Sequence, residues 1–311
     1  MKKITGLFAI LALMLMAVQV QAIELGVYER GVLVPSVYHD GASIDTVVGL
    51  ICQDTTQGCT GHNVDTKTNK TQIYWTFFDV DSQHVTDGVL PCTDDDLVPF
   101  SWKANSGRNL DKVSGYLVFA TASENFKISA NAFLVDTAKK DAIFVPVIPL
   151  ANSDINSGFT RTNMEVTNLS YGTRAGNTLD ARYWMDPTYN AGTTIVVWLV
   201  DPYVNSKKQP IPITVLAYND NEMAKSVTIT LPHELNKIIP CNIPGLPNDY
   251  IDGFIQLTLP TSPTDVVAGV AYSYISSTLF GAQQTLLAAE CEGPRASVPN
   301  PPSCGCQGAG Q

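Results

Sequence analysis

The chain has little charge, and positive charge is particularly scarce. Only 15% of its 311 residues are Asp, Glu, Lys or Arg, and 19 Lys and Arg stand against 29 Asp and Glu, which gives a net charge of −10. No stretch concentrates Lys and Arg into a basic stripe. Since positive charge attracts polyanions at long range, this composition disfavours binding to nucleic acid or to anionic lipid. We therefore expect no nucleic-acid partner.

The common catalytic signatures are also missing. The chain has no Gly-x-Ser-x-Gly, no phosphate-binding Gly-rich loop followed by Lys-Ser or Lys-Thr, and no Cys-x-x-Cys-His. His233 and Glu234 begin like a zinc-protease motif, but Lys237 occupies the place of the second histidine. These absences favour a protein that is not an enzyme.

Long apolar runs are scarce after the first segment. Residues 4–18 are mainly apolar, and Lys2 and Lys3 precede them. The run is short for a membrane span of about 20 residues, and residues 20–22 suit a signal-peptidase site. We expect a signal peptide over residues 1–22, with a retained membrane anchor as the alternative. The mature chain would begin near Ile23, contain no transmembrane segment and be exported to the periplasm, cell surface or extracellular space.

Seven cysteines follow this segment, and disulfides are their expected state in an oxidising compartment. Seven is odd, which leaves at least one thiol free or paired with another chain. A bond from Cys52 to Cys59 is the most local pairing, and one from Cys241 to Cys291 would close a long loop, but spacing alone does not decide between pairings. The disulfide candidates are Cys52, Cys59, Cys241, Cys291, Cys304 and Cys306.

A weak metal-binding pattern overlaps these cysteines. Cys52, Cys59 and His62 form a Cys-x6-Cys-x2-His group. Thiolates and imidazoles bind zinc and copper, and Cys92 or His39 would supply a fourth ligand. The alternative is a Cys52–Cys59 disulfide beside an exposed histidine, which an oxidising compartment favours. The group is a zinc or copper hypothesis that competes with a disulfide.

Acidic residues gather after the strongest predicted strand. Asp79 and Asp81 follow its apolar residues, and Asp87 lies shortly beyond them. Carboxylates in loops are calcium ligands, although this spacing does not match an EF-hand. A solvated acidic loop is the alternative, as it is for the oxygen-rich residues 94–96 and 219–222. We expect no cofactor, and calcium is the one metal that these loops suggest.

The apolar pattern indicates β-structure. Residues 71–80 (TQIYWTFFDV) carry apolar side chains on both faces, which is typical of a buried central strand. Residues 126–135 alternate between apolar and polar side chains. Residues 142–150 hold two prolines and fit an edge strand or a crossing between domains. Strand candidates recur about every ten residues, a spacing typical of sandwiches or barrels.

The second half continues the same pattern, and a turn-rich stretch over residues 151–158 marks a domain boundary. Residues 89–102 are expected to be mostly loop, and residues 278–290 fit either a helix or a last strand. We predict a mainly β fold of two tandem β-sandwich (immunoglobulin-like) domains, residues 23–150 and 151–290, with a flexible tail over residues 291–311. The strand candidates of the second half span residues 160–169, 179–185, 193–200, 211–218, 227–231, 254–259 and 266–275.

Three functions fit this interpretation. The leading hypothesis is an exported non-catalytic structural or binding module of the cell envelope or extracellular space, with other envelope or extracellular proteins or glycans as partners. One alternative is a secreted carboxylate-dependent hydrolase acting on glycans, which would draw on Asp79, Asp81 or Glu165. A pocket with converging carboxylates or a perturbed histidine would favour it. The other alternative is a metal- or redox-handling protein that uses Cys304 and Cys306. The tryptophans would suit sugar stacking, although core packing explains most of them.

Overall fold

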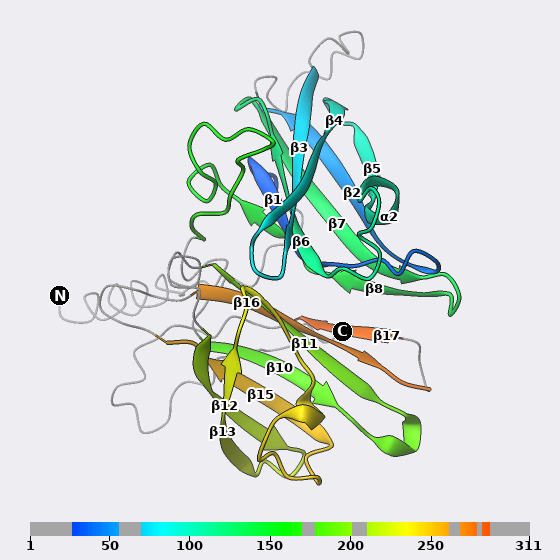
Figure 1. Ribbon diagram of the computed structural model, residues 1–311, viewed down its shortest axis with the longest axis vertical. Coiled ribbons are helices and arrows are strands. Elements are labelled where there is room, and N and C mark those ends of the chain that lie inside the picture. The colour runs from blue at the N-terminus through cyan, green and yellow to red at the C-terminus, as the bar shows by residue number, and fades with distance from the viewer. Residues whose placement is uncertain are drawn as a thin grey trace, which may run out of the picture.

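The computed structural model describes residues 27–55, 70–169, 178–200, 210–260, 268–278 and 282–286. These residues are mainly β and form four antiparallel sheets. Two sheets come from the chain before residue 151 and two from the chain after residue 177, and we call them the first and second sheet pairs (Figure 1). The predicted mainly β fold is confirmed.

The first sheet pair contains a five-stranded and a four-stranded sheet. In spatial order, the five-stranded sheet consists of β4 (His84–Thr93), β3 (Lys70–Asp79), β6 (Gly115–Thr121), β1 (Gly31–Val37) and β9 (Ile148–Leu150). The four-stranded sheet consists of β5 (Leu97–Ser101), β2 (Ile44–Asp54), β7 (Phe126–Asp136) and β8 (Asp141–Val145).

The second sheet pair contains two four-stranded sheets. One consists, in spatial order, of β10 (Thr178–Trp184), β15 (Asp252–Thr258), β12 (Ile211–Asn219) and β13 (Ala224–Leu231). The other consists of β14 (Leu235–Ile238), β11 (Gly192–Val200), β16 (Ala268–Ser276) and β17 (Ala282–Leu286). The helical elements of the described residues are single turns: α2 (Trp102–Asn105), η1 (Pro187–Tyr189) and η2 (Pro240–Asn242).

Strands β3 and β7 follow the side-chain patterns that predicted them. In β3, Ile73 and Phe77 are buried, and so is Phe78 on the opposite face, because β3 lies inside its sheet between β4 and β6. In β7, Phe126 and Ile128 are buried while the intervening Lys127 is half-buried. Both predictions are confirmed.

The predicted edge segment at residues 142–150 is confirmed as two edge strands. β8 closes the four-stranded sheet of the first pair, and β9 closes the five-stranded sheet. The chain therefore crosses from one sheet to the other between Val145 and Ile148. Pro146 lies in this crossing, and the edge strand β9 tolerates Pro149 because an edge strand leaves some of its backbone N–H groups without a ladder partner.

Two predictions of local structure were wrong. Residues 89–102 contain the second half of β4, all of β5 and the start of α2 instead of a loop, since Pro91 and Pro99 lie on the edge strands β4 and β5, where proline is tolerated. Residues 160–169 form a turn followed by irregular chain, with one isolated β-bridge from Val166 to Ile155, instead of a strand. The Asn163 side chain accepts hydrogen bonds from the backbone N–H (2.5 Å) and hydroxyl (2.8 Å) of Thr160, and this local bonding competes with a sheet ladder. Of the two alternatives for residues 278–290, the strand is observed, as β17.

Strand β11 is buried on both faces and connects the two sheet pairs. Ile195, Val197 and Leu199 belong to the core inside the second sheet pair. Val196 and Trp198 alternate with them and belong to the core that extends through the first sheet pair. Because side chains alternate along a strand, β11 contributes to both cores. Figure 1 shows β11 and β16 on the side of the second sheet pair that faces the first.

The segment between the two sheet pairs packs on the first of them. Ile155, Met164 and Leu169 are buried in the core of that pair. Thr76 Oγ1 of β3 donates a hydrogen bond to the carbonyl of Arg161 (2.9 Å). Residues 151–169 therefore lie with the strands that precede them, and the second sheet pair begins with β10.

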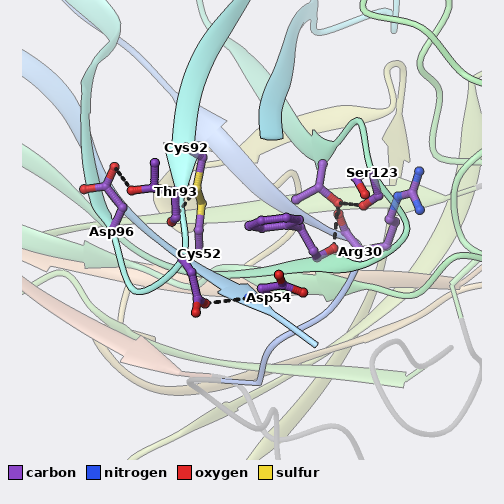
Figure 2. Close-up of a disulfide and its surroundings, with 10 residues drawn as sticks. Arg30, Cys52, Asp54, Cys92, Thr93, Asp96 and Ser123 are labelled. Atoms are coloured by element: carbon purple, nitrogen blue, oxygen red, sulfur yellow. Dashed lines mark hydrogen bonds between the residues drawn. A yellow bond between two sulfur atoms is a disulfide. The ribbon is translucent and has the colours of Figure 1, made fainter. Parts of the chain in front are cut away.

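A disulfide joins the two sheets of the first pair. Cys52 of β2 is bonded to Cys92 of β4, with the Cα atoms 6.5 Å apart and both residues buried (Figure 2). The acidic turn that follows β4 is fixed beside it, because Asp96 accepts a hydrogen bond from the Thr93 hydroxyl (3.2 Å) and Asp95 N–H donates to the Cys52 carbonyl (2.9 Å). The local Cys52–Cys59 pairing is therefore wrong.

The predicted signal peptide (residues 1–22) and the tail (residues 291–311) lie outside the described residues. Within the part of the chain that the structure describes, no helix combines the length and apolarity needed to cross a membrane.

Candidate functional site

The two sheet pairs meet along strands β14, β11 and β16, and we call this contact the seam. Leu235, Trp198 and Tyr272, one from each strand, belong to the core that extends through the first sheet pair. The turn after β3 also reaches the seam, where the carbonyl of Val80 accepts hydrogen bonds from the backbone N–H groups of Glu234 (3.1 Å) and Leu235 (3.1 Å). Apolar packing and backbone hydrogen bonds thus connect the two halves.

A polar cluster surrounds this backbone contact. Glu234 is buried, and its carboxylate accepts hydrogen bonds from the hydroxyls of Ser82 and Tyr116 (3.4 Å from Tyr116 Oη). Ser82 Oγ also lies 2.6 Å from Tyr116 Oη. Burial and, secondly, the charge of Glu234 raise the pKa of Tyr116. The phenol therefore stays protonated at neutral pH and donates to the carboxylate.

This cluster does not form a hydrolytic triad. A serine nucleophile needs an adjacent base that is itself oriented by a third group. The nearby histidine, His233, instead places Nδ1 2.5 Å from Asp81 Oδ1, while Ser82 is bonded to a carboxylate and a phenol. We interpret the cluster as a set of hydrogen bonds that holds the two sheet pairs together.

A cavity of about 300 Å³ lies at the seam between the β7–β8 hairpin and strand β16. Its walls are mainly apolar and aromatic, and both sheet pairs contribute to them. The first sheet pair supplies Ile44, Leu134, Ile143 and Val145, and the second supplies Tyr272 and Tyr274. The side chains at positions 272 and 274 face the same side of β16, because alternate residues of a strand share a face.

Among the described residues that line the cavity, Lys237 of β14 is the cation without a carboxylate partner. Its Nζ donates a hydrogen bond to Ser114 Oγ (2.9 Å) and lies 5.7 Å from the ring centroid of Tyr38, which also lines the cavity. Among the described residues, no carboxylate forms an ion pair with Lys237. Burial of the ammonium lowers the pKa of Lys237. The ammonium is therefore partly desolvated, although the Lys237 side chain as a whole is exposed, and no described residue neutralises its charge.

The carboxylates at the cavity belong to the β7–β8 hairpin. Asp136 accepts hydrogen bonds from the backbone N–H groups of Ala138 (3.0 Å) and Lys139 (3.2 Å), and it pairs with the Lys139 ammonium at 3.7 Å. Asp141 stands opposite Asp136 in the antiparallel register. Asp136 is therefore engaged in holding the hairpin turn.

The three carboxylates of the calcium hypothesis make separate contacts. Asp79 Oδ1 accepts backbone hydrogen bonds from Asp81 (2.9 Å) and Gln83 (2.9 Å), which form a turn, and Asp81 contacts His233 across the seam. Asp87 lies on β4 and pairs with His84 and with Arg161, at 3.3 Å from Arg161 Nε. The described residues hold no group of three or more His, Cys, Asp or Glu side chains placed for a metal ion. The calcium hypothesis therefore gains no support here.

The disulfide removes Cys52 from the proposed zinc or copper ligands Cys52, Cys59 and His62. Cys52 is bonded to Cys92, so neither offers a thiolate, and Cys59 and His62 lie outside the described residues. The proposed fourth ligand, His39, is buried beside the Trp102 ring, with 6.1 Å between ring centroids.

The remaining cysteine candidates are mostly outside the described part of the chain. Cys241 is exposed on η2 and forms no disulfide with a described residue. Cys291, Cys304 and Cys306 lie outside the described residues. A Cys241–Cys291 bond and a metal or redox role of the tail thus stay predictions.

Core packing accounts for three of the four tryptophans, as expected. Trp75, Trp102 and Trp198 are buried, whereas Trp184 is half-buried and its ring lies 5.7 Å from that of Tyr189. The hydrolase candidates Asp79, Asp81 and Glu165 are absent from the cavity lining.

Sequence reasoning missed the residues that build the cavity. It treated Lys237 only as a failed metal ligand, because nothing in the sequence places that residue beside Tyr38. The alternation of tyrosines within residues 266–275 was a usable signal of a shared aromatic face. No protein-family model matches the chain, and the search of curated proteins found no match.

Proposed function

We propose that the protein is an exported, non-catalytic binding module of the cell envelope or extracellular space, built from two β-sandwich domains. Antiparallel sheets with a shared core support the broad immunoglobulin-like architecture for each sheet pair. Other envelope or extracellular proteins, or glycans, would be its macromolecular partners. The cavity at the seam is the observation that carries the binding function.

The cavity has the usual character of a small-molecule site. Such sites are concave, mainly apolar, furnished with few polar groups and frequent at domain interfaces. Residues of both sheet pairs line this cavity, and among its described lining residues are tyrosines and one lysine without an ion-pair partner, beside apolar side chains. Its volume of about 300 Å³ favours a small ligand.

The arrangement of acidic groups supports a non-catalytic role. A carboxylate-dependent hydrolase needs two carboxyl groups facing a substrate. Of the two carboxylates at the cavity, Asp136 is engaged by its hairpin turn and by Lys139, and Asp141 stands opposite it on the same hairpin. Glu234, outside the cavity lining, is engaged by Ser82 and Tyr116. The disulfide between Cys52 and Cys92 supports export, because disulfides persist in oxidising compartments.

Binding of a neutral apolar probe tests this proposal. N-phenyl-1-naphthylamine should give a saturable rise in fluorescence with the full-length exported protein. In the variant Ile143→Trp, an indole replaces a wall residue, so the probe should bind much more weakly. The matched control is Val85→Trp, which adds the same ring at a position on β4 that is 41% exposed and outside the cavity lining.

Both variants should retain the circular dichroism spectrum of the wild-type protein. Absence of saturable probe binding to the wild type would overturn the proposal. So would undiminished affinity in a folded Ile143→Trp variant.

A further inference from the structure

We propose that the cavity at the seam binds a small molecule with an apolar body and a single carboxylate, whose head contacts the ammonium of Lys237. This inference rests on the proposed binding function and adds the chemical class of the ligand. It is carried by the placement of Lys237 relative to the cavity walls and by the lack of a carboxylate partner for it among the described residues.

The register of the sheet places Lys237 on the cavity side. Lys237 stands opposite Val196 of β11, and Val196 stands opposite Tyr272 of β16. Directly opposed residues of neighbouring strands point to the same face of a sheet. Lys237 and Tyr272 therefore flank Val196 on the face that meets the first sheet pair, where Val196 and Tyr272 are buried.

The ammonium of Lys237 retains capacity for an anion. A protonated lysine has three N–H donors, and its contacts in the described residues are the Ser114 hydroxyl and the Tyr38 ring. Both contacts are with neutral groups, so the positive charge has no neutralising partner among the described residues. A ligand carboxylate would supply that partner through a charge-assisted hydrogen bond.

The other charges at the cavity determine where a ligand head can lie. Lys139 already pairs with Asp136. Asp141, opposite Asp136 on the hairpin, would repel a second negative charge. An anionic head is therefore directed to Lys237 and away from the hairpin, and a single negative charge suits the site better than a dianion such as a phosphate monoester.

The hydroxyl groups in the cavity are suited to hold the head group. Burial raises the pKa of Tyr272, so its phenol stays neutral at physiological pH. A neutral phenol can donate a hydrogen bond to a carboxylate, which a phenolate cannot do. The apolar body of the ligand would pack against Leu134, Ile143 and Val145.

A matched set of ligands tests the inference. Octanoate, octan-1-ol and octylamine share one apolar chain and differ in the charge of the head. Each is titrated against the N-phenyl-1-naphthylamine complex of the full-length protein at neutral pH. Octanoate should displace the probe at least roughly tenfold better than octan-1-ol, the ratio expected for a charge-assisted hydrogen bond in a partly buried site. Octylamine should displace it least.

Substitutions at Lys237 and at a lysine outside the cavity assign this preference. Lys237→Met should abolish the preference for octanoate while retaining displacement by octan-1-ol, and Lys237→Arg should restore the preference. Lys225→Met is the matched control, because Lys225 lies on β13 with an exposed side chain outside the cavity lining, and it should retain the preference.

Several outcomes would overturn the inference. Equal displacement by octanoate and octan-1-ol, stronger displacement by octylamine, or an unchanged preference in Lys237→Met would do so and would leave the proposed binding function standing. Failure of the probe itself to bind would overturn both.

Discussion

The rings of Tyr116 and Trp198 meet edge to face across the seam, with 5.6 Å between their centroids. Tyr116 lies on β6 of the first sheet pair and Trp198 on β11 of the second. Trp198 is fully buried, on the face of β11 opposite to Ile195 and Val197. The pair therefore joins the core of one half to a strand that completes the core of the other.

Replacement of this tryptophan should weaken the whole protein. Trp198→Ala removes a large buried side chain and leaves a cavity, which typically costs about 3–5 kcal/mol of unfolding free energy. The measurement is urea denaturation followed by circular dichroism. The control is Phe254→Ala, which truncates an aromatic ring that is 55% exposed in the second sheet pair and should cost much less. Equal losses in the two variants would contradict a shared core at the seam.

Removal of the disulfide should destabilise the first sheet pair. Cys52 and Cys92 are separated by 40 positions in the sequence, and chain-entropy estimates for a loop of that length give about 4 kcal/mol. The double variant Cys52→Ala/Cys92→Ala should lose stability of this order in urea denaturation without reductant. Cys241→Ser, which changes an exposed thiol, should differ little from the wild type. A double variant as stable as the wild type would show that this bond constrains the unfolded chain little.

Stability should fall above about pH 10, where tyrosines ionise in an unfolded chain. Burial raises the pKa of Tyr116, Tyr183 and Tyr272 above that value. At alkaline pH the unfolded chain therefore binds fewer protons than the folded chain, and the unfolding free energy decreases as pH rises. The lowered pKa of Lys237 makes the unfolding free energy increase with pH, but this is a single group, whereas three tyrosines make it decrease.

Urea denaturation at a series of pH values between about 9 and 11 measures this effect. Tyr272→Phe should show a shallower decline than the wild type, because one of the three groups is removed. Full phenolate absorbance of the native protein near pH 10 would contradict the shift.

The pattern of apolar and polar side chains along the sequence was enough to predict some strands. The two apolar faces of β3 and the alternation in β7 follow from side-chain period alone. Pattern reasoning did not recover β4 and β5, because Pro91 and Pro99 suggest a loop until the sheet order places their strands at edges. Residues 160–169 were predicted as a strand because they are rich in β-prone residues. In the structure, hydrogen bonds between Thr160 and Asn163 form a turn there instead.

The sequence by itself determined that this is a mainly β chain of low charge whose cysteines are expected to form disulfides. Those properties depend on composition and on neighbours along the chain. The tertiary structure decided that Cys52 pairs with Cys92, that β11 is buried on both faces, and that Lys237 lies over Tyr38 with no ion-pair partner among the described residues. Each of these depends on which distant strands pack together, and a side-chain pattern fixes the faces of a strand but not its partners.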